Sequence, residues 1–245
     1  MPGKARVLVT RPEPGASETA GLLEALGFLP IKLPLHEIRP LPVDAGAIPD
    51  NVAAVAVTSA NAMRHAPDEI IERLKALPCF AVGASTANAA TDAGFSAVIE
   101  GGGDAEALAE IIVGRHPGGT VAYLCGKVRR AVFERRLADE HIAIHALETY
   151  DTVGLSYSTE EVINLTTRRP IDYVLVYSAN AAEVLAATMR RPQLEDLFEN
   201  AIFVCISGRV AEALGGWPGK RIQTAPEPDE PALLSLLGRV TDKAS

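Results

Sequence analysis

Small and hydroxyl-bearing residues follow two apolar runs of this sequence. Thr58-Ser59-Ala60-Asn61 follows VAAVAV, and Tyr177-Ser178-Ala179-Asn180 follows a similar run 119 residues later. Each stretch opens an alanine-rich segment in which we expect a helix. The first N–H groups of a helix lack partners within it, and the helix dipole is positive there, so such turns can bind carboxylates or phosphates. Ser59 and Ser178 could instead act only as helix caps.

Three more turns have the same character. Gly83–Thr86 in CFAVGASTANA and Ser207–Arg209 in FVCISGRVAEA each follow the next apolar run, and Thr10-Arg11-Pro12 ends the run VLV. Because the two halves agree in sequence, in position and in the turn that comes next, we interpret the chain as an internal duplication. Ligands of open parallel sheets bind beyond the carboxyl ends of the strands. The recurrence therefore favours anion binding over capping alone.

Tyr150 is the residue best suited to proton transfer. It lies in the extended segment LETYDTV, between Thr149 and Asp151. A tyrosine with its ordinary pKa near 10 keeps its proton at neutral pH, so its hydroxyl can protonate a departing oxygen. A role in packing alone is the alternative.

Other reactive or metal-binding patterns are weak. Gly101-Gly102-Gly103-Asp104 lacks the lysine of a phosphate-binding loop, and we interpret it as a turn before a capped helix. His141 and His145 have no carboxylate partner at a spacing that would bind a metal, and GxSxG is absent. Three cysteines, Cys79, Cys125 and Cys205, lie far apart in apolar runs, which predicts buried, reduced thiols.

Composition and charge exclude several classes of protein. The chain has 245 residues, of which 48% are hydrophobic, and a mean hydropathy of +0.14, values typical of a well-packed globular protein. The formal net charge is −8 and no basic run exceeds two residues, so we expect no nucleic-acid partner. No apolar run is long enough to span a membrane, and the N-terminus lacks an apolar leader, so we predict a cytoplasmic protein.

Short β-branched runs alternate with amphipathic segments, a pattern that predicts parallel sheets covered by helices. The predicted strands are Arg6–Thr10, Leu29–Leu33, Ala53–Thr58, Cys79–Val82, Ala97–Glu100, Val121–Cys125, Ile142–Ala146, Tyr173–Ser178, Ile202–Ser207 and Ile222–Ala225. Asp104 is the expected cap of the helix that follows it, and Ser158 with Glu161 forms a capping-box pattern.

The strand count predicts a discontinuous first domain. A division near residue 150 would leave only three strands for the second half, too few for an independent core. We therefore predict an α/β domain of residues 1–35 plus 154–245 and an inserted α/β domain of residues 43–146, each flavodoxin-like with a five-stranded parallel sheet. Segments 36–42 and 147–153 would join them as a two-stranded β-ladder hinge, and the cleft between the domains is the expected ligand site.

Six segments carry a resemblance to a known family: VLVTRP, VTSANAM at 57–63, AVGASTANA at 81–89, LCGKVRRAVFERRL at 124–137, ALETYDT at 146–152 and VYSANAAE at 176–183. In their order and spacing the chain resembles the uroporphyrinogen-III synthases from Val7 to about Leu237. The resemblance implies two α/β domains joined by a β-ladder, and a reaction that uses no metal and no organic cofactor.

The substrate implied by the resemblance is hydroxymethylbilane, a linear tetrapyrrole with eight carboxylates on the route to haem, cobalamin and chlorophyll. Loss of its terminal hydroxyl leaves an electrophilic azafulvene on ring A. Ring D attacks through its substituted carbon, and the resulting spiro intermediate fragments and recloses with ring D inverted. Uncatalysed closure gives the isomer without inversion, so the protein must control geometry as well as rate.

The resemblance and the turns described above together define the expected site. Tyr150 would be the proton donor. The expected substrate-binding residues are Arg11, Ser59, Ala60, Asn61, Ser85, Thr86, Gly126, Arg129, Ser178, Ala179, Asn180, Ser207 and Arg209. The second glycine turn departs from the family's usual Gly-Pro-x-Thr-Ala, because Val210 lacks the hydroxyl expected to face the substrate. Either Arg209 replaces that contact or the site is weakened.

Two other classes of function compete with the cyclising lyase. A non-catalytic tetrapyrrole- or anion-binding sensor on the same scaffold is the main alternative, with Val210 in mild support. A nucleotide-sugar transferase is disfavoured by the small domains and the missing nucleotide loop. We expect a monomer that makes transient contact with the enzyme that supplies its substrate.

Overall fold

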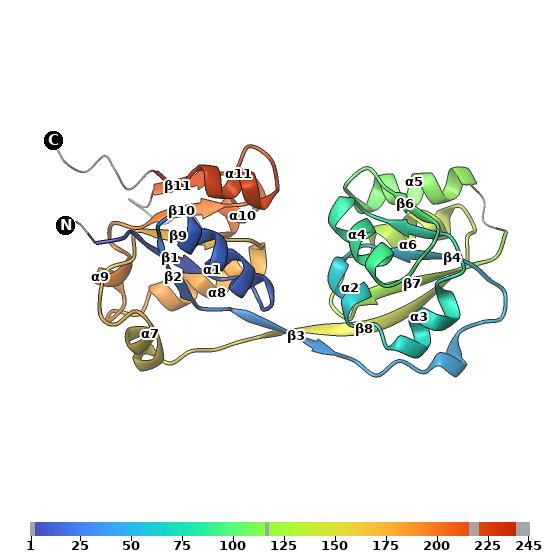
Figure 1. The fold of residues 1–245 in the computed structure, drawn as a ribbon, viewed down its shortest axis with the longest axis horizontal. Coiled ribbons are helices and arrows are strands. Elements are labelled where there is room, and N and C mark those ends of the chain that lie inside the picture. Colours follow the sequence, from blue (N-terminus) through green and yellow to red (C-terminus); the bar gives the residue numbers. More distant parts are fainter. Residues whose placement is uncertain (1–2, 116–117, 216–220, 239–245) are drawn as a thin grey trace. The chain divides into compact units, whose positions relative to one another are not determined.

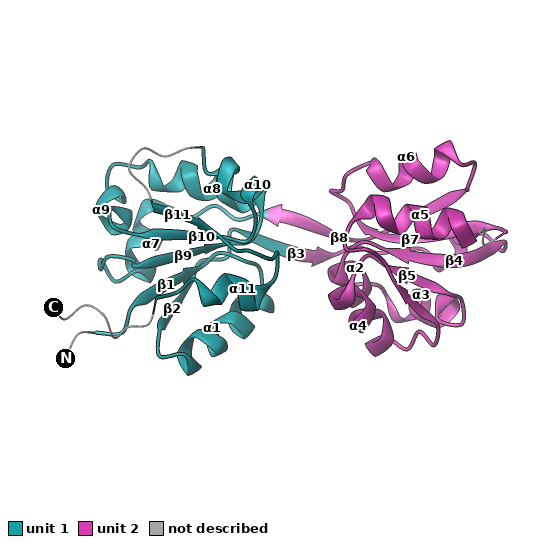
Figure 2. Cartoon of the chain, turned by 90° about the horizontal axis from the view of Figure 1, so that it is seen from above, with its two compact units in different colours: residues 1–37, 154–245 teal, residues 38–153 magenta. Residues whose placement is uncertain are grey.

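The computed structural model describes residues 3–115, 118–215 and 221–238. The chain divides into two compact units, residues 1–37 with 154–245 and residues 38–153, which Figure 2 colours separately. Each unit is a mixed α/β structure built on a mainly parallel sheet, and the elements are labelled in Figure 1. No helix in the described parts of the chain combines the length and apolar character needed to cross a bilayer.

The sheet of the first unit has five parallel strands in the order β11-β10-β9-β1-β2. The strands are β1 Arg6–Val9, β2 Leu29–Lys32, β9 Tyr173–Val176, β10 Ile202–Cys205 and β11 Arg221–Thr224. Alternate side chains of β1 lie in different core clusters: Leu8 in one, Val7 and Val9 in the other. The central strands are thus apolar on both faces, as strands covered by helices must be.

The helices that the described residues form over this sheet are α1 Gly15–Ala25, α7 Thr159–Leu165, α8 Ala179–Met189, α9 Glu195–Phe198, α10 Gly208–Ala213 and α11 Glu230–Ser235. Leu23 of α1 and Leu233 of α11 belong to one core cluster, whereas Leu185 of α8 and Val210 of α10 belong to the other. The predicted capping box is confirmed, because the Ser158 Oγ accepts from the Glu161 N–H and the Glu161 carboxylate accepts from the Ser158 N–H.

The second sheet has six strands in the order β3-β8-β7-β4-β5-β6. They are β3 His36–Pro40, β4 Val52–Val57, β5 Cys79–Ala81, β6 Val98–Glu100, β7 Thr120–Gly126 and β8 Ile144–Gly154. β4 to β8 are parallel. β3 runs antiparallel to β8, because Leu41 bonds to Thr149 while Leu35 bonds to Leu155, each at 2.9 Å.

The helices of the second unit pack on both faces of its sheet. They are α2 Ala60–Arg64, α3 Asp68–Leu74, α4 Ala84–Asp92, α5 Ala105–Arg115 and α6 Val132–Asp139, with a short 3₁₀ helix, η1, at Ala45–Ala47. Ile70 and Ala90 belong to one core cluster, and Leu108 and Phe133 to the other. Asp104 caps α5 as predicted, since its carboxylate accepts from the Ala107 N–H at 2.8 Å.

One feature of the predicted fold is wrong. The sequence interpretation separated a strand at Ile142–Ala146 from a hinge segment at 147–153, whereas the structure has one strand of eleven residues, β8. No glycine or proline interrupts residues 144–153, and the first glycine is Gly154, so nothing in the sequence ends the strand earlier. With β3 paired beside β8, the second sheet therefore has six strands and not five.

Candidate functional site

In the second unit, α2 begins directly after β4. Ser59 is its N-cap, and the Ser59 Oγ accepts from the Asn61 N–H at 3.2 Å. The Ala62 N–H bonds to the Ser59 carbonyl at 3.0 Å, whereas the Ala60 N–H has no partner in the described parts of the chain. The capping role of Ser59 is thus confirmed, and one main-chain donor remains open beside it.

In the first unit, α8 begins after β9 in the same way. The Ser178 Oγ accepts from the Ala181 N–H at 3.2 Å, and the Ala182 N–H bonds to the Ser178 carbonyl at 3.0 Å. Among the described residues nothing accepts from the N–H groups of Ala179 and Asn180. Capping by Ser178 is also confirmed, and α8 presents two open donors at the carboxyl edge of its sheet.

The two recurring Ser-Ala-Asn turns, at residues 59–61 and 178–180, occupy equivalent places in the two sheets. β9 lies between β1 and β10, and β4 lies between β7 and β5. The second pair of matching turns, Ser207–Arg209 and Gly83–Thr86, follows β10 in one sheet and β5 in the other, where α10 and α4 begin. The two units therefore place matching turns at the carboxyl edges of matching strands.

The turns before α4 and α10 use main-chain caps, since Gly83 and Ser207 make no side-chain capping bond. Ser85 and Arg209, at the second helical position, are exposed. Thr86 and Val210, at the third, are 5% and 1% exposed, and their N–H groups bond to the Gly83 and Ser207 carbonyls.

Burial at this third position changes how Val210 is interpreted. Val210 belongs to a hydrophobic core cluster, so its side chain does not lie at the surface where a ligand could reach it. The expected loss of a substrate-facing hydroxyl is therefore corrected: a side chain at this position packs inward. Thr86 also has neither an exposed side chain nor a free N–H for a ligand.

Arg11 follows β1 and contacts three neighbours. Its Nη1 donates to the Glu230 Oε1 at 3.1 Å and to the Thr19 Oγ1 at 3.3 Å. Its guanidinium carbon lies 4.7 Å from the centre of the Tyr177 ring, within the range of a cation–π contact. The Arg11 side chain is 29% exposed, so one part of it is fixed while another reaches the surface.

Arg129 follows β7 and is also held by acidic residues. Its Nη1 donates to the Glu148 Oε1 at 2.7 Å, and its Nη2 and Nε donate to the Glu134 Oε1 at 3.0 and 3.1 Å. These contacts raise the pKa of Arg129 further above its ordinary value. A third contact, to the Gly126 carbonyl at 3.1 Å, ties the residue to the end of β7.

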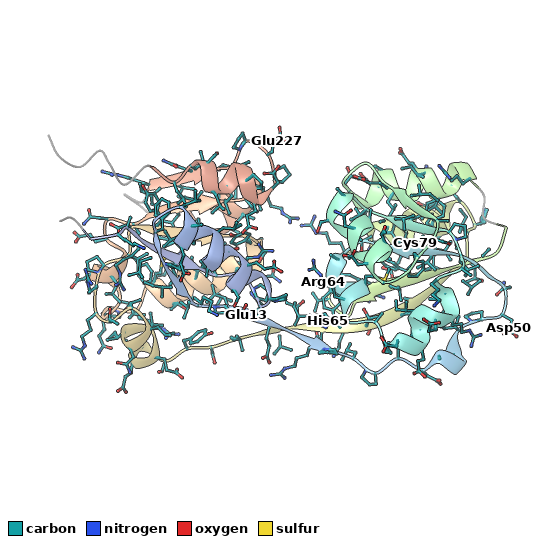
Figure 3. All side chains as sticks on the ribbon, viewed as in Figure 1. Glu13, Asp50, Arg64, His65, Cys79 and Glu227 are labelled. Atoms are coloured by element: carbon teal, nitrogen blue, oxygen red, sulfur yellow. The ribbon has the colours of Figure 1, made fainter. Side chains whose placement is uncertain are left out.

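Gly126 and Tyr150 lie against each other. A β-carbon at Gly126 would come within 2.7 Å of the Tyr150 Cζ and 2.9 Å of its hydroxyl oxygen, so glycine allows the ring to lie there. Tyr150 is 8% exposed, and its ring centre lies 6.3 Å from that of His65, at the end of α2. Burial and the neighbouring Arg64 lower the pKa of His65; Figure 3 labels both residues.

The Tyr150 hydroxyl has no hydrogen-bond partner in the described part of the chain. Among the described residues, Arg6 Nε is the only fully buried side-chain polar atom without a partner. The unpartnered Tyr150 hydroxyl is therefore not fully buried. The hydroxyl of an otherwise buried ring therefore reaches the surface at the end of β7. This is the geometry that a side-chain proton donor requires.

The cysteines carry no reactive site. Cys79, Cys125 and Cys205 are buried and free of disulfides, as predicted, and Figure 3 labels Cys79 inside the second unit. Burial raises the pKa of each thiol to about 12. At neutral pH they are therefore protonated and poor nucleophiles.

The structure gathers the predicted site residues along one edge of each sheet. Arg11, Ser178, Ala179, Asn180, Ser207 and Arg209 lie in turns that follow β1, β9 and β10, and Ser59, Ala60, Asn61, Ser85, Gly126 and Arg129 lie at or after the ends of β4, β5 and β7. Tyr150 lies within β8, paired with Gly126. Sequence reasoning missed the acidic partners Glu230, Glu134 and Glu148, of which only Glu134 lies close in the sequence to its arginine.

The fold and these edges define a class of parallel α/β protein with two units and matching helix-start turns at the carboxyl edges of both sheets. The uroporphyrinogen-III synthase HemD family matches residues 17–235, so the chain belongs to that family. Its members are enzymes of the cyclising lyase type, and this chain is one of them. No curated protein sequence matches the chain at a significant level.

Solved structures show the same fold. Uroporphyrinogen-III synthetase from Helicobacter pylori is 18% identical, with a TM-score of 0.67 over 95% of this chain and 97% of that one. A mutant uroporphyrinogen III synthase from Thermus thermophilus is 20% identical, with a TM-score of 0.58 over 94% and 96%. At these identities the likeness concerns the fold, and the family match carries the function.

Proposed function

We propose that this chain closes hydroxymethylbilane to uroporphyrinogen III with inversion of ring D. The observation that carries the proposal is the family match over residues 17–235. The open main-chain donors at the carboxyl edges of both sheets support it, because the substrate has eight carboxylates to be held.

The main-chain donors explain how an acidic protein binds a polyanion. The formal net charge of −8 repels such a ligand at long range, so affinity must come from local groups. Oriented N–H groups at a helix start bind carboxylates without adding net charge. We assign this role first to α8 and α4, the two longest of the four helices at these turns. Like Ala179 and Asn180 of α8, Ala84 and Ser85 of α4 have N–H groups without a partner among the described residues.

Tyr150 is the proposed proton donor. Departure of the substrate's terminal hydroxyl breaks a C–O bond, and a proton delivered to that oxygen lets it leave as water. The Tyr150 hydroxyl is an O–H donor and can supply this proton. The electron-deficient carbon left behind is then attacked by ring D through its substituted carbon, and the spiro intermediate reopens and recloses with that ring inverted.

The two units are proposed to act as domains. Segments 36–42 and 147–153 would form the hinge, a role supported by the antiparallel pairing of β3 with β8. The protein would then control ring D by holding the substrate's carboxylates while the last pyrrole of the tetrapyrrole stays free to turn. Positioning of this kind can supply a large part of a catalytic barrier.

The test supplies freshly made hydroxymethylbilane and separates the oxidised products by isomer. Isomer III in excess, formed faster than spontaneous closure, is the expected result. Isomer I at the spontaneous rate, together with tight binding of a tetrapyrrole, would instead identify a non-catalytic sensor. Isomer I without binding would remove both assignments.

A further inference from the structure

Three donors from the first unit converge on one carboxylate oxygen. The Glu230 Oε1 accepts from the Arg11 Nη1 at 3.1 Å, from the Tyr177 hydroxyl at 3.1 Å, and from the Thr19 Oγ1 in a shorter contact. Arg11 follows β1, Thr19 lies in α1, Tyr177 follows β9 and Glu230 begins α11. A single carboxylate thus fixes side chains that lie 53 to 219 residues away in the sequence.

The guanidinium of Arg11 is fixed on more sides than this. Its carbon lies 4.7 Å from the centre of the Tyr177 ring. It also lies against the backbone of Gly15, where a β-carbon would come within 2.5 Å of Nε and 2.9 Å of Nη2. Any larger residue at position 15 would displace the group, so its place depends on Gly15, Tyr177 and Glu230 together.

Half of the guanidinium remains available. Only Nη1 makes hydrogen bonds within the described residues, which leaves Nε and Nη2 without acceptors there. The Arg11 side chain is 29% exposed and Glu230 is 24% exposed, so solvent reaches the pair. Two adjacent N–H donors of a fixed guanidinium match the two oxygens of a carboxylate.

The second unit also has an arginine held by glutamates after the equivalent strand. β7 lies between β4 and β8 as β1 lies between β9 and β2. The arginine after β7, Arg129, is held by Glu148 at 2.7 Å and by Glu134 at 3.0 Å. An arginine held by the unit's own glutamates therefore occurs twice, but Glu134 occupies the Nε and Nη2 donors of Arg129 that stay open in Arg11.

We propose that Glu230 is a positioning residue that holds Arg11 ready to bind a substrate carboxylate through Nε and Nη2. This proposal rests on the proposed function and adds to it a defined carboxylate contact in the first unit. Glu230 itself does not touch the substrate. Its effect passes through Arg11, and this dependence makes the proposal testable.

The test measures KM and kcat for hydroxymethylbilane and the dissociation constant for uroporphyrin III, a stable octacarboxylate. Arg11→Ala and Glu230→Ala should each raise KM and the dissociation constant about tenfold, the size of one lost charge-assisted contact, with less change in kcat. Glu230→Gln keeps an oxygen acceptor for all three donors, so its KM should stay within about threefold of the wild type.

The double variant separates positioning from a general effect on the fold. If Glu230 acts through Arg11, adding Glu230→Ala to Arg11→Ala should raise KM no further. Glu227→Ala is the matched control, because it removes the same charge from the exposed turn before α11 without contacting Arg11; Figure 3 labels Glu227. This control should leave KM unchanged.

Three results would overturn the proposal. The first is that the effects of Arg11→Ala and Glu230→Ala on KM add in the double variant. The others are a KM for Glu230→Gln as high as that of Glu230→Ala, and a KM for Glu230→Ala below that of the wild type. If Glu230→Ala fails to fold, Glu230→Asp replaces it, because it keeps the charge but withdraws the oxygen by one methylene. That variant should raise KM several-fold, and an unchanged KM would again reject the proposal. Wild-type formation of isomer III reports on the proposed function separately.

Discussion

Gly126→Ala is the substitution that bears most directly on Tyr150. The new β-carbon would lie 2.7 Å from the Tyr150 Cζ, 2.9 Å from its hydroxyl oxygen and 3.0 Å from Cε2. The ring must therefore retreat by roughly 0.7 Å before the shortest of these contacts reaches an ordinary van der Waals distance. The backbone of Gly126 has no positive φ, so alanine is acceptable there except for this contact.

Two consequences of different size are expected. Overpacking of a buried site costs about 1–3 kcal/mol, partly offset by the lower flexibility of an alanine in the unfolded chain, worth about 0.4–1 kcal/mol. The free energy of unfolding should therefore fall by about 1–2 kcal/mol. Displacement of a proton donor by nearly 1 Å costs up to about 100-fold, so kcat should fall roughly 10- to 100-fold.

The measurements are chemical unfolding and the rate of isomer III formation. Gly154→Ala is the matched control, because Gly154 also lies in a strand, β8, and a β-carbon there meets nothing within 4 Å. The control should keep full activity. An unchanged kcat in Gly126→Ala, or an equal loss in Gly154→Ala, would refute the argument that the position of the Tyr150 ring matters.

Four further outcomes are expected. Tyr150→Phe should lower kcat at least about 10-fold with little change in stability, because no described residue bonds to its hydroxyl; an unchanged rate would end its role as donor. Ala179→Pro removes an open N–H at the first position of α8, where proline is tolerated, so KM should rise several-fold while the thermal midpoint stays within a few degrees; an unaltered KM would argue against that amide as a ligand. Because burial raises the pKa of Cys79 to about 12, a thiol reagent at pH 8 should label it only after unfolding; rapid labelling of the folded chain would contradict this burial. Burial lowers the pKa of His36, so the unfolded chain takes up the proton first as the pH falls. The free energy of unfolding should then decrease below about pH 6.5, and His36→Phe should reduce that decrease; an identical pH dependence in both proteins would count against it.

Local patterns were sufficient to predict most elements. Each of the ten predicted strands begins within two residues of an observed one, because buried strands between helices leave short β-branched runs. The caps at Asp104 and Ser158 were also predictable, since a capping bond joins residues only three positions apart.

Longer-range features were less accessible. β8 continues into the predicted hinge because it pairs there with β7 as well as with β3. The pairing with β3 was predicted as the hinge ladder, whereas no local sequence pattern reveals that the pairing with β7 continues so far. The contact of Glu230 with Arg11 spans 219 residues. Neither residue carries a local sign of its partner, so the role of Glu230 emerges only from the fold.

The turns show the same division between local and tertiary information. Their sequence predicted exposed, substrate-facing residues at the third helical position, yet Thr86 and Val210 are buried. A residue at that position faces the sheet, and only the packing of α4 and α10 on their strands makes this evident. The first and second positions of these helices remain the exposed ones.

The ratio of product isomers formed by the wild type and by Ala179→Pro tests the central claim most directly. If main-chain donors at the sheet edges hold the tetrapyrrole while its last ring turns over, the wild type gives predominantly isomer III. At limiting substrate, the proline variant should release a larger share of isomer I, because more of the substrate closes in solution. A wild type that yields isomer I alone, or a variant whose isomer ratio is unaltered under those conditions, would contradict the account.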